Sequence, residues 1–99
     1  MAAKALQIHP DALDELKSAL GWYSERSKTA GFNFIAEIDQ AIDNIAESPS
    51  RWPQGEYGTR KFTLRRFPFA IIYRETETSI QIVAIAHGRR QPGYWKKRR

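Results

Sequence analysis

Basic side chains gather in the second half of the sequence, and they are the groups best suited to chemistry. Arginine offers a planar fork that binds phosphate or carboxylate through two hydrogen bonds. For any single arginine, solvation at the surface is the commoner role, but the cluster as a whole predicts a binding surface. The candidate binding residues are Lys61, Arg65, Arg66, Arg74, His87, Arg89, Arg90, Tyr94 and Trp95.

The spacing of these residues predicts that strands present them. Side chains alternate along a strand, so Lys61 and Arg65 share one face of it. Arg66 lies at the break that follows, and Arg74 ends the next strand. Antiparallel pairing would bring several of these groups close to the basic residues that follow the last strand.

A titratable residue within the cluster is a candidate for catalysis. Histidine has the ordinary pKa nearest neutrality, which makes His87 the candidate general acid or base, with Tyr94 as its natural partner. With arginines to stabilise a phosphorane, such a pair could cleave RNA. The alternative is structural, with His87 hydrogen-bonded to the backbone at the end of a strand.

Aromatic and basic residues alternate near the end of the chain. Tyr94-Trp95 precedes a run of four positive charges at 96–99. Such a segment can stack on bases. Alternatively, Trp95 folds back and anchors the tail, and the charge run is a solvated chain end. The earlier aromatics, including Trp22 and Phe32, have mostly the spacing of core residues.

Length and composition bound the class of protein. The chain has 99 residues, 41% hydrophobic and 27% charged, which fits one domain over residues 1–99. It has no cysteine and only two histidines, so we predict no disulfide, no metal site and no cofactor. We find neither a secretory signal nor an apolar run of the roughly 20 residues that cross a bilayer. We therefore expect a cytoplasmic protein that does not use a membrane.

Charge is distributed unevenly along the chain. Residues 1–50 hold four basic and eight acidic residues, a net charge of −4, whereas residues 51–99 hold twelve basic and three acidic ones, a net charge of +9. This asymmetry predicts a polyanion or an acidic protein as the partner of the second half.

The first half of the chain has helical periodicity. It follows a short edge strand over 5–8, with Leu6 and Ile8 expected to point inward. One helix opens at 9–11 and fades near 27, and a second begins around 31–32 and ends before Pro49. The apolar stripes of the two helices are Leu13, Leu16, Leu20 and Tyr23, then Phe34, Ile38, Ala41 and Ile45.

After a loop at 53–58 the apolar period changes to two. Strands are predicted at 61–65, 69–74 and 79–87. The predicted fold class is α+β: an N-terminal strand, an α-helical hairpin, then a three-stranded antiparallel meander with the helices packed on one face. The other face of the sheet is expected to carry many of the basic side chains.

Two ordered strings resemble the RelE/ParE toxin superfamily. They are Arg66-Phe67-Pro68-Phe69-Ala70-Ile71-Ile72-Tyr73-Arg74, and residues 80–95 with Ile-Ala-His at 85–87 and Arg-Arg at 89–90. The resemblance extends back through the helical hairpin and covers nearly the whole chain. It implies a RelE/ParE-like fold and the toxin component of a bacterial type II toxin–antitoxin module, of the kind that stabilises plasmids.

The strings look closer to the ParE branch than to the RelE ribonucleases. ParE-like toxins are described as inhibitors that trap a complex of DNA gyrase and DNA, without catalysis of their own. The resemblance therefore implies gyrase as the target and an acidic, partly disordered antitoxin as the partner, in a homodimer or a toxin–antitoxin hetero-oligomer. The net charge of +9 on residues 51–99 agrees with an acidic antitoxin.

RelE-like, ribosome-dependent cleavage of mRNA is the alternative. RelE-type nucleases carry an arginine just before the apolar run of the central strand, where this chain has Ala70. Their other basic residues would correspond to the 61–65 region and to Arg89 or Arg90, and their C-terminal tyrosine to Tyr94. In this alternative, His87 or Tyr94 is the catalytic residue. A third hypothesis is a chain that binds an antitoxin and poisons nothing.

Overall fold

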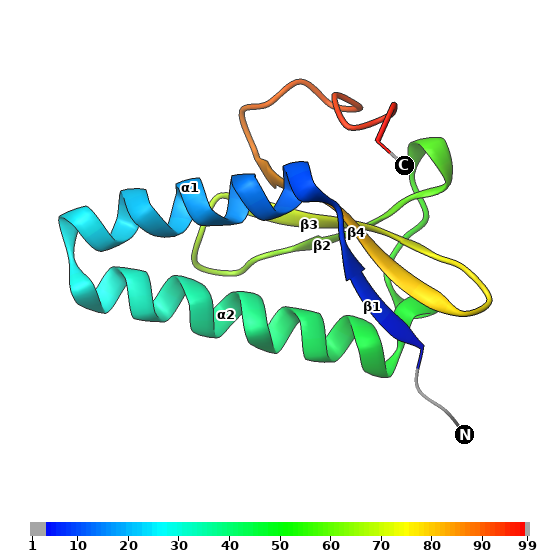
Figure 1. Cartoon of the computed structure of the whole chain (residues 1–99), viewed down its shortest axis with the longest axis horizontal. Helices are drawn as coiled ribbons and strands as arrows, with labels where there is room; N and C mark the ends of the chain where they lie inside the picture. Colours follow the sequence, from blue (N-terminus) through cyan, green and yellow to red (C-terminus); the bar gives the residue numbers. More distant parts are fainter. Residues whose placement is uncertain (1–3, 99) are drawn as a thin grey trace.

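A helical hairpin separates the first strand from the rest of the sheet in chain order (Figure 1). The computed structural model describes residues 4–98, and Arg99, the last charge of the predicted run, lies outside them. The elements are β1 (Ala5–Ile8), α1 (Pro10–Arg26), α2 (Lys28–Glu47), β2 (Arg60–Thr63), β3 (Phe69–Glu75) and β4 (Ser79–His87), with short 3-10 helices η1 (Pro49–Arg51) and η2 (Glu56–Gly58) before β2.

The four strands form one mixed sheet in the order β1-β4-β3-β2. Strands β2, β3 and β4 are antiparallel neighbours, as predicted for the meander. Strand β1 instead pairs in parallel with β4, with Ala5 opposite Ser79 and Ile8 opposite Ile82. A parallel pair needs a long connection, which the helical hairpin and the other two strands supply. The predicted α+β fold class is confirmed.

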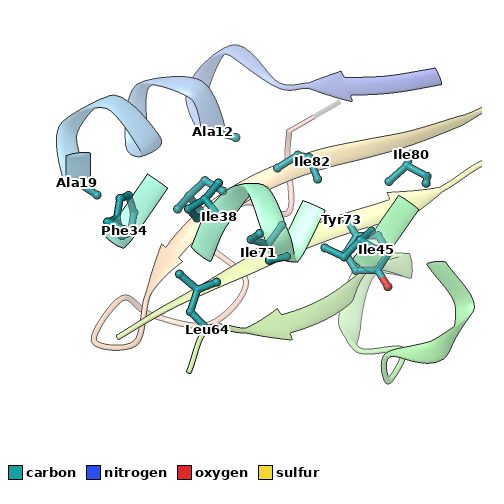
Figure 2. Packing of buried hydrophobic residues seen from close by; sticks show 12 residues of the cluster. Ala12, Ala19, Phe34, Ile38, Ile45, Leu64, Ile71, Tyr73, Ile80 and Ile82 are labelled. Atoms are coloured by element: carbon teal, nitrogen blue, oxygen red, sulfur yellow. The ribbon is translucent and has the colours of Figure 1, made fainter. Parts of the chain in front are cut away.

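The helical hairpin covers one face of the sheet, and the main core lies between them (Figure 2). All four predicted stripe residues of α2 are at most 2% exposed. They pack against side chains of β3 and β4, chiefly Ile71, Tyr73, Ile80, Ile82 and Ile85. Burial of one such side chain contributes about 1.5–3 kcal/mol, so this layer is the main source of hydrophobic stabilisation.

The opposite face of the sheet is covered by the end of the chain. A second buried cluster lies there, and Tyr94 and Trp95 pack against it. Its members are Ala70, Ile72, Val83, Ala84 and Ala86. This face was expected to carry many of the basic side chains, and the structure adds that its centre consists of small apolar residues, which leave room for an aromatic layer. Of the two alternatives for Trp95, the structure has the one in which it folds back and anchors the chain end.

Strand β1 does not bury the side chains expected of it. Leu6 is 45% and Ile8 37% exposed, so the prediction that both point inward is wrong. β1 is an edge strand with a neighbour on one side only, and all four of its residues are exposed. The alternation of apolar and polar residues therefore predicts the strand correctly here, but it does not predict a buried face.

Helix α2 begins three residues earlier than predicted. Ser27 ends α1, and its Oγ accepts a hydrogen bond of 3.2 Å from the Ala30 N–H to cap α2. Gly31, which resembles a break in the sequence, is buried inside α2. A Cβ there would lie 3.2 Å from Ser24 Cα, so this glycine allows the two helices to approach closely.

Strand β2 is shorter than predicted, and it ends at Thr63. The chain then bends, and the Arg65 and Arg66 N–H groups donate to the Glu37 carboxylate of α2. Arg65 therefore lies outside the strand, and the prediction that it shares a strand face with Lys61 is wrong. The carboxylate satisfies backbone donors that the strand would have used.

Several apolar side chains of the hairpin face solvent. Trp22 is 52% and Phe32 72% exposed, and Leu13 is also exposed, so their assignment to the core is wrong. Helix α1 turns Ala12 and Ala19 to the core instead. Within residues 4–98, no helix has both the length and the apolar character needed to cross a membrane.

Candidate functional site

A hollow of about 230 Å³ lies on the face of the sheet that the end of the chain covers. Several predicted site residues line it. Lys61 comes from β2, His87 from the end of β4, Arg90 from the following turn, and Trp95 from the chain end. Its floor includes Ala70, Ile72 and Ala86. We call it the basic hollow, and we call residues 94–98 the tail.

Strand pairing explains how these residues meet. Lys61 lies opposite Ile72 of β3, whose side chain belongs to the second cluster. His87 pairs with Phe69, the first residue of β3, three positions before Ile72. The cations of β2 and of the last turn thus flank a strip of small apolar residues.

A bulge in β4 determines which residues face the tail. Ile72 pairs with Ala84, whereas Tyr73 pairs with Ile82, so Val83 is an extra residue. Both Val83 and Ala84 consequently belong to the tail-facing cluster, while Ile82 and Ile85 belong to the main core. The bulge therefore lets β4 serve both layers.

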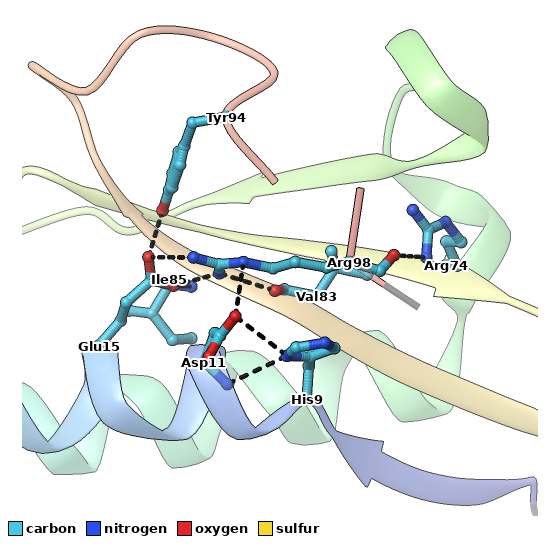
Figure 3. Close-up of polar contacts among 8 residues, drawn as sticks. All are labelled: His9, Asp11, Glu15, Arg74, Val83, Ile85, Tyr94 and Arg98. Atoms are coloured by element: carbon cyan, nitrogen blue, oxygen red, sulfur yellow. Dashed lines mark hydrogen bonds and ion pairs between the residues drawn. The ribbon is translucent and has the colours of Figure 1, made fainter. Parts of the chain in front are cut away.

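The carboxylate of Glu15 joins the tail to α1 and the sheet (Figure 3). Its Oε1 accepts from the Ile85 N–H at 3.0 Å and from Arg98 Nη1 at 2.8 Å. Its Oε2 accepts from the Tyr94 hydroxyl at 2.7 Å and from Arg98 Nη2 at 3.1 Å. Burial acts to raise the pKa of Glu15, but these hydrogen bonds together outweigh it and lower the pKa.

Arg98 makes contacts with three other parts of the fold (Figure 3). Its Nη1 also donates to the Val83 carbonyl at 3.1 Å, and its Nε lies 3.7 Å from Asp11 Oδ2. Its own carbonyl accepts from Arg74 Nη1 at 3.0 Å. The hydrogen bond to Glu15 is the main cause that raises the pKa of Arg98, so this side chain remains charged.

Glu15 and Arg98 together take the place of a strand at the edge of β4. β1 pairs with β4 only as far as Ile82, whose carbonyl also accepts from the His9 N–H at 2.9 Å. Beyond that point the Val83 carbonyl and the Ile85 N–H are taken by the two side chains. Unpaired backbone groups at a sheet edge need partners, and here an ion pair supplies them.

Tyr94 is held between this ion pair and Arg90. The guanidinium carbon of Arg90 lies 3.8 Å from the centroid of the Tyr94 ring, in the range of a cation–π contact. Burial, followed by the hydrogen bond to Glu15, raises the pKa of Tyr94 far above its ordinary value. The hydroxyl is a donor to a carboxylate in this arrangement, and it is a poor proton acceptor for a substrate.

Trp95 packs on the second cluster at some cost. Its ring centroid lies 5.3 Å from that of Tyr94. Its Nε1 is buried and has no hydrogen-bond partner among residues 4–98. An unsatisfied buried donor costs about 1–3 kcal/mol, which the apolar contacts of the ring must offset.

His87 makes the structural contact expected at a strand end. Its Nδ1 accepts from the Arg89 N–H at 3.0 Å, and its ring meets Phe69 edge-on at 5.0 Å. The same residue lines a larger groove of about 610 Å³ between α1 and the ends of β3 and β4. The groove lining includes Trp22, Tyr23, Phe69, His87 and Arg90.

The remaining predicted site residues do not line the basic hollow. Arg65 and Arg66 are on the loop tied to Glu37. Arg74 donates to the backbone carbonyl of Arg98 and does not line the hollow. Arg89 is exposed in the turn after β4. The structure thus brings together Lys61, His87, Arg90, Tyr94 and Trp95.

Sequence reasoning did not identify Glu15 as part of this arrangement. In the sequence it resembles any acidic residue near the start of a helix, and Arg98 resembles part of a solvated charge run. Their partnership spans 83 positions, so no local pattern indicates it. Burial of both side chains against a bulge is visible only in three dimensions.

Known proteins resemble this chain in sequence and in fold. A family model described as the ParE toxin of the type II toxin-antitoxin system, parDE, matches residues 6–92. Toxin ParE2 of Mycobacterium tuberculosis, in strains CDC 1551 / Oshkosh and ATCC 25618 / H37Rv, is 25% identical over 92 residues, which cover 90% of this chain and 86% of that protein.

Among solved structures, a chain of the chromosomal ParDE TA system from P. aeruginosa has the same fold. The TM-score is 0.75 at 20% sequence identity, over 86% of this chain and 96% of that chain. The family match includes Lys61, His87 and Arg90, but it ends before the tail, which begins at Tyr94.

Proposed function

This chain belongs to the ParE toxin family of type II toxin–antitoxin systems, and on that premise we propose that it stops bacterial growth by binding and inhibiting DNA gyrase. The basic hollow is the proposed contact surface, with Lys61 and Arg90 as its cations. A ParD-type antitoxin with an acidic segment is the proposed inhibitor of the toxin.

The observation that most favours a binding role over a catalytic one is the position of the Tyr94 hydroxyl. It donates to Glu15 at 2.7 Å, and burial raises its pKa further from the range of a general base. Ala70 also occupies the place where the RelE-type pattern has an arginine, and it is buried under the tail. The cations of the hollow are therefore better suited to hold a partner than to drive a proton transfer.

The charge distribution supports an acidic antitoxin. Residues 51–99 carry a net charge of +9, and Arg90 lines both the basic hollow and the large groove beside α1. An acidic segment with apolar side chains would place carboxylates near Arg90 and apolar groups on the aromatic lining of the groove. Binding of the cognate antitoxin should weaken between 0.1 M and 0.5 M salt, as measured by calorimetry, and a salt-independent affinity would argue against this mode.

Supercoiling of relaxed plasmid DNA by purified gyrase tests the proposed target. The wild-type protein should block formation of supercoiled DNA, and Lys61→Ala should need about tenfold more toxin for the same effect, since a lost charge-assisted contact corresponds to about one order of magnitude. Lys17→Ala, which removes an exposed lysine of α1, is the matched control. Normal supercoiling at high excess of wild-type toxin would overturn the proposal.

RelE-like cleavage of mRNA remains a second candidate because His87 lines the same hollow as Lys61 and Arg90. A translation extract separates the two functions: an endonuclease would cut mRNA on ribosomes, and His87→Ala would abolish the cut. If His87→Ala and Tyr94→Phe both leave growth arrest intact, the endonuclease candidate fails.

A further inference from the structure

Glu15 and Arg98 hold the tail in place, although neither lines the basic hollow. We propose that this pair is a latch that positions the tail, and that recognition of the target through the basic hollow requires the latch to be closed. Glu15 and Arg98 are thus positioning residues for the surface described above. The inference rests on the proposed function only in its choice of target.

The latch is built into an edge of the sheet. Glu15 and Arg98 bond to each other and also to the Ile85 N–H and the Val83 carbonyl, which the end of β1 leaves free. Opening the latch would leave two backbone groups of β4 without protein partners. These two backbone atoms therefore determine where the tail lies when the latch is closed. Attraction between the two charges alone would not determine a single position.

The tail in turn shapes the hollow. Trp95 forms one wall of it, and the Tyr94 ring lies under the guanidinium of Arg90 at 3.8 Å. A shift of the tail would move this wall and remove the surface on which Arg90 rests. Through Tyr94, which also donates to Glu15, the latch and the Arg90 cation are parts of one connected arrangement.

Apart from the latch, the tail is held by the packing of Tyr94 and Trp95 on the second cluster. Lys96 and Lys97 are exposed, and the buried Trp95 Nε1 lacks a partner among the described residues. The carbonyl of Arg98 accepts a hydrogen bond from Arg74. This contact depends on the position of Arg98, which the latch itself fixes. Loss of the Glu15–Arg98 pair should consequently loosen residues 94–98, with the apolar packing of Trp95 as their main remaining contact.

Two pairs of variants separate a latch from a simple effect of charge. Arg98→Gln and Lys97→Gln each remove one positive charge from the tail, but only the first removes a latch residue. Glu15→Gln and Glu25→Gln each remove one negative charge from α1, and Glu25 is an exposed residue of the same helix. Arg98→Lys keeps the charge without the two-pronged geometry and should restore part of the function.

Tail order and target inhibition are measured on the same proteins. Glu15→Gln and Arg98→Gln should each speed amide hydrogen exchange at residues 94–98, and trypsin cleavage there, about tenfold, while the main core exchanges as in the wild type. Each should raise the toxin concentration for half-inhibition of gyrase about tenfold. The double variant should be no worse than either single variant, because both break the same contact.

The outcomes distinguish the latch from the proposed target. If Glu15→Gln frees the tail and gyrase inhibition is unchanged, or if Lys97→Gln has the same effect as Arg98→Gln, the latch is overturned and the proposed function stands. If the wild type does not inhibit gyrase, the proposed function fails. The latch is then supported where Arg98→Gln weakens growth arrest and Lys97→Gln does not, and overturned where the two act equally.

Discussion

Glu15 and Arg98, 83 positions apart in the chain, are joined by hydrogen bonds of 2.8 and 3.1 Å. The contact links the first turns of α1 to the end of the tail and spans the part of the β4 edge that β1 leaves unpaired. In a chain of 99 residues, where the buried fraction of the surface is modest, one partly buried ion pair of this kind has a measurable share of the stability. Its response to pH, to packing and to substitution can be predicted.

Acid should destabilise the protein through Glu15. Its pKa is lowered on folding, so the unfolded chain binds the proton more readily, and the free energy of unfolding falls as the pH drops. The contribution is fully present above about pH 4.3, the ordinary pKa of a glutamate. It is lost as the pH falls through the lower pKa of the folded state. Urea unfolding between pH 7 and pH 2.5 measures this loss.

Glu15→Gln provides the comparison for that experiment. The variant should be less stable than the wild type at pH 7, and the difference should shrink toward zero in acid, because the wild type then also lacks the charge. Other groups near the latch, including His9, Asp11, Tyr94 and Arg98, are common to both proteins. Stability curves that remain parallel down to pH 2.5 would contradict the prediction.

Two glycines of the helical hairpin should respond in opposite directions to alanine. At Gly31 a Cβ would lie within contact distance of Ser24 Oγ and 3.2 Å from Ser24 Cα, so Gly31→Ala should destabilise the protein by about 1–3 kcal/mol. At Gly21, in α1, a Cβ meets nothing within 4 Å. Gly21→Ala should therefore stabilise the protein by about 0.5–1 kcal/mol. Thermal and urea unfolding of both variants test the pair, and an equal effect of the two would refute the close approach at Gly31.

Local patterns in the sequence predicted those parts of the fold that depend on neighbouring positions. The helical period of Phe34, Ile38 and Ile45 gave the buried face of α2, and the period of two gave the strands of the meander. The apolar residues of β1 also followed the expected alternation. Their exposure depends on which other elements cover the edge of the sheet, and the alternation of residues within the strand does not predict this cover.

The candidate site was predictable in part, for the same reason. Lys61, His87 and Arg90 could be chosen from residue type and strand position, and they meet in the basic hollow. The latch could not, because Glu15 and Arg98 each have an ordinary local role in the sequence. Nor could the bulge at Val83, since it changes the face of the following residues without a glycine or proline to indicate it.

Trp95 should tolerate phenylalanine better than alanine. Trp95→Ala removes the ring that covers the second cluster, which should cost about 3 kcal/mol and free the tail. Trp95→Phe keeps an aromatic ring and removes the unpartnered Nε1, so the lost contacts are partly offset by relief of the unsatisfied donor. Urea unfolding and hydrogen exchange at residues 94–98 measure both. A loss for phenylalanine as large as that for alanine would show that the indole nitrogen has a partner in solution.

The cations predicted from the sequence should differ in whether they contact the target. The sequence places Lys61 and Arg66 in one cluster, whereas in the structure only Lys61 lines the basic hollow and the backbone at Arg66 is tied to Glu37 of α2. Lys61→Glu and Arg66→Glu change the net charge equally. If the hollow is the contact surface, Lys61→Glu should abolish inhibition of gyrase, and Arg66→Glu should shift the half-inhibitory concentration by less than about threefold, the size expected of long-range charge at physiological salt.

The same two variants carry their own control for folding. Both positions are exposed, so neither substitution should lower the midpoint of thermal unfolding by more than a few degrees, given that surface changes are usually within about 0.5 kcal/mol. Equal loss of inhibition by both would mean that the target is attracted by net charge. Retained inhibition by Lys61→Glu alone would remove the basic hollow from the contact surface.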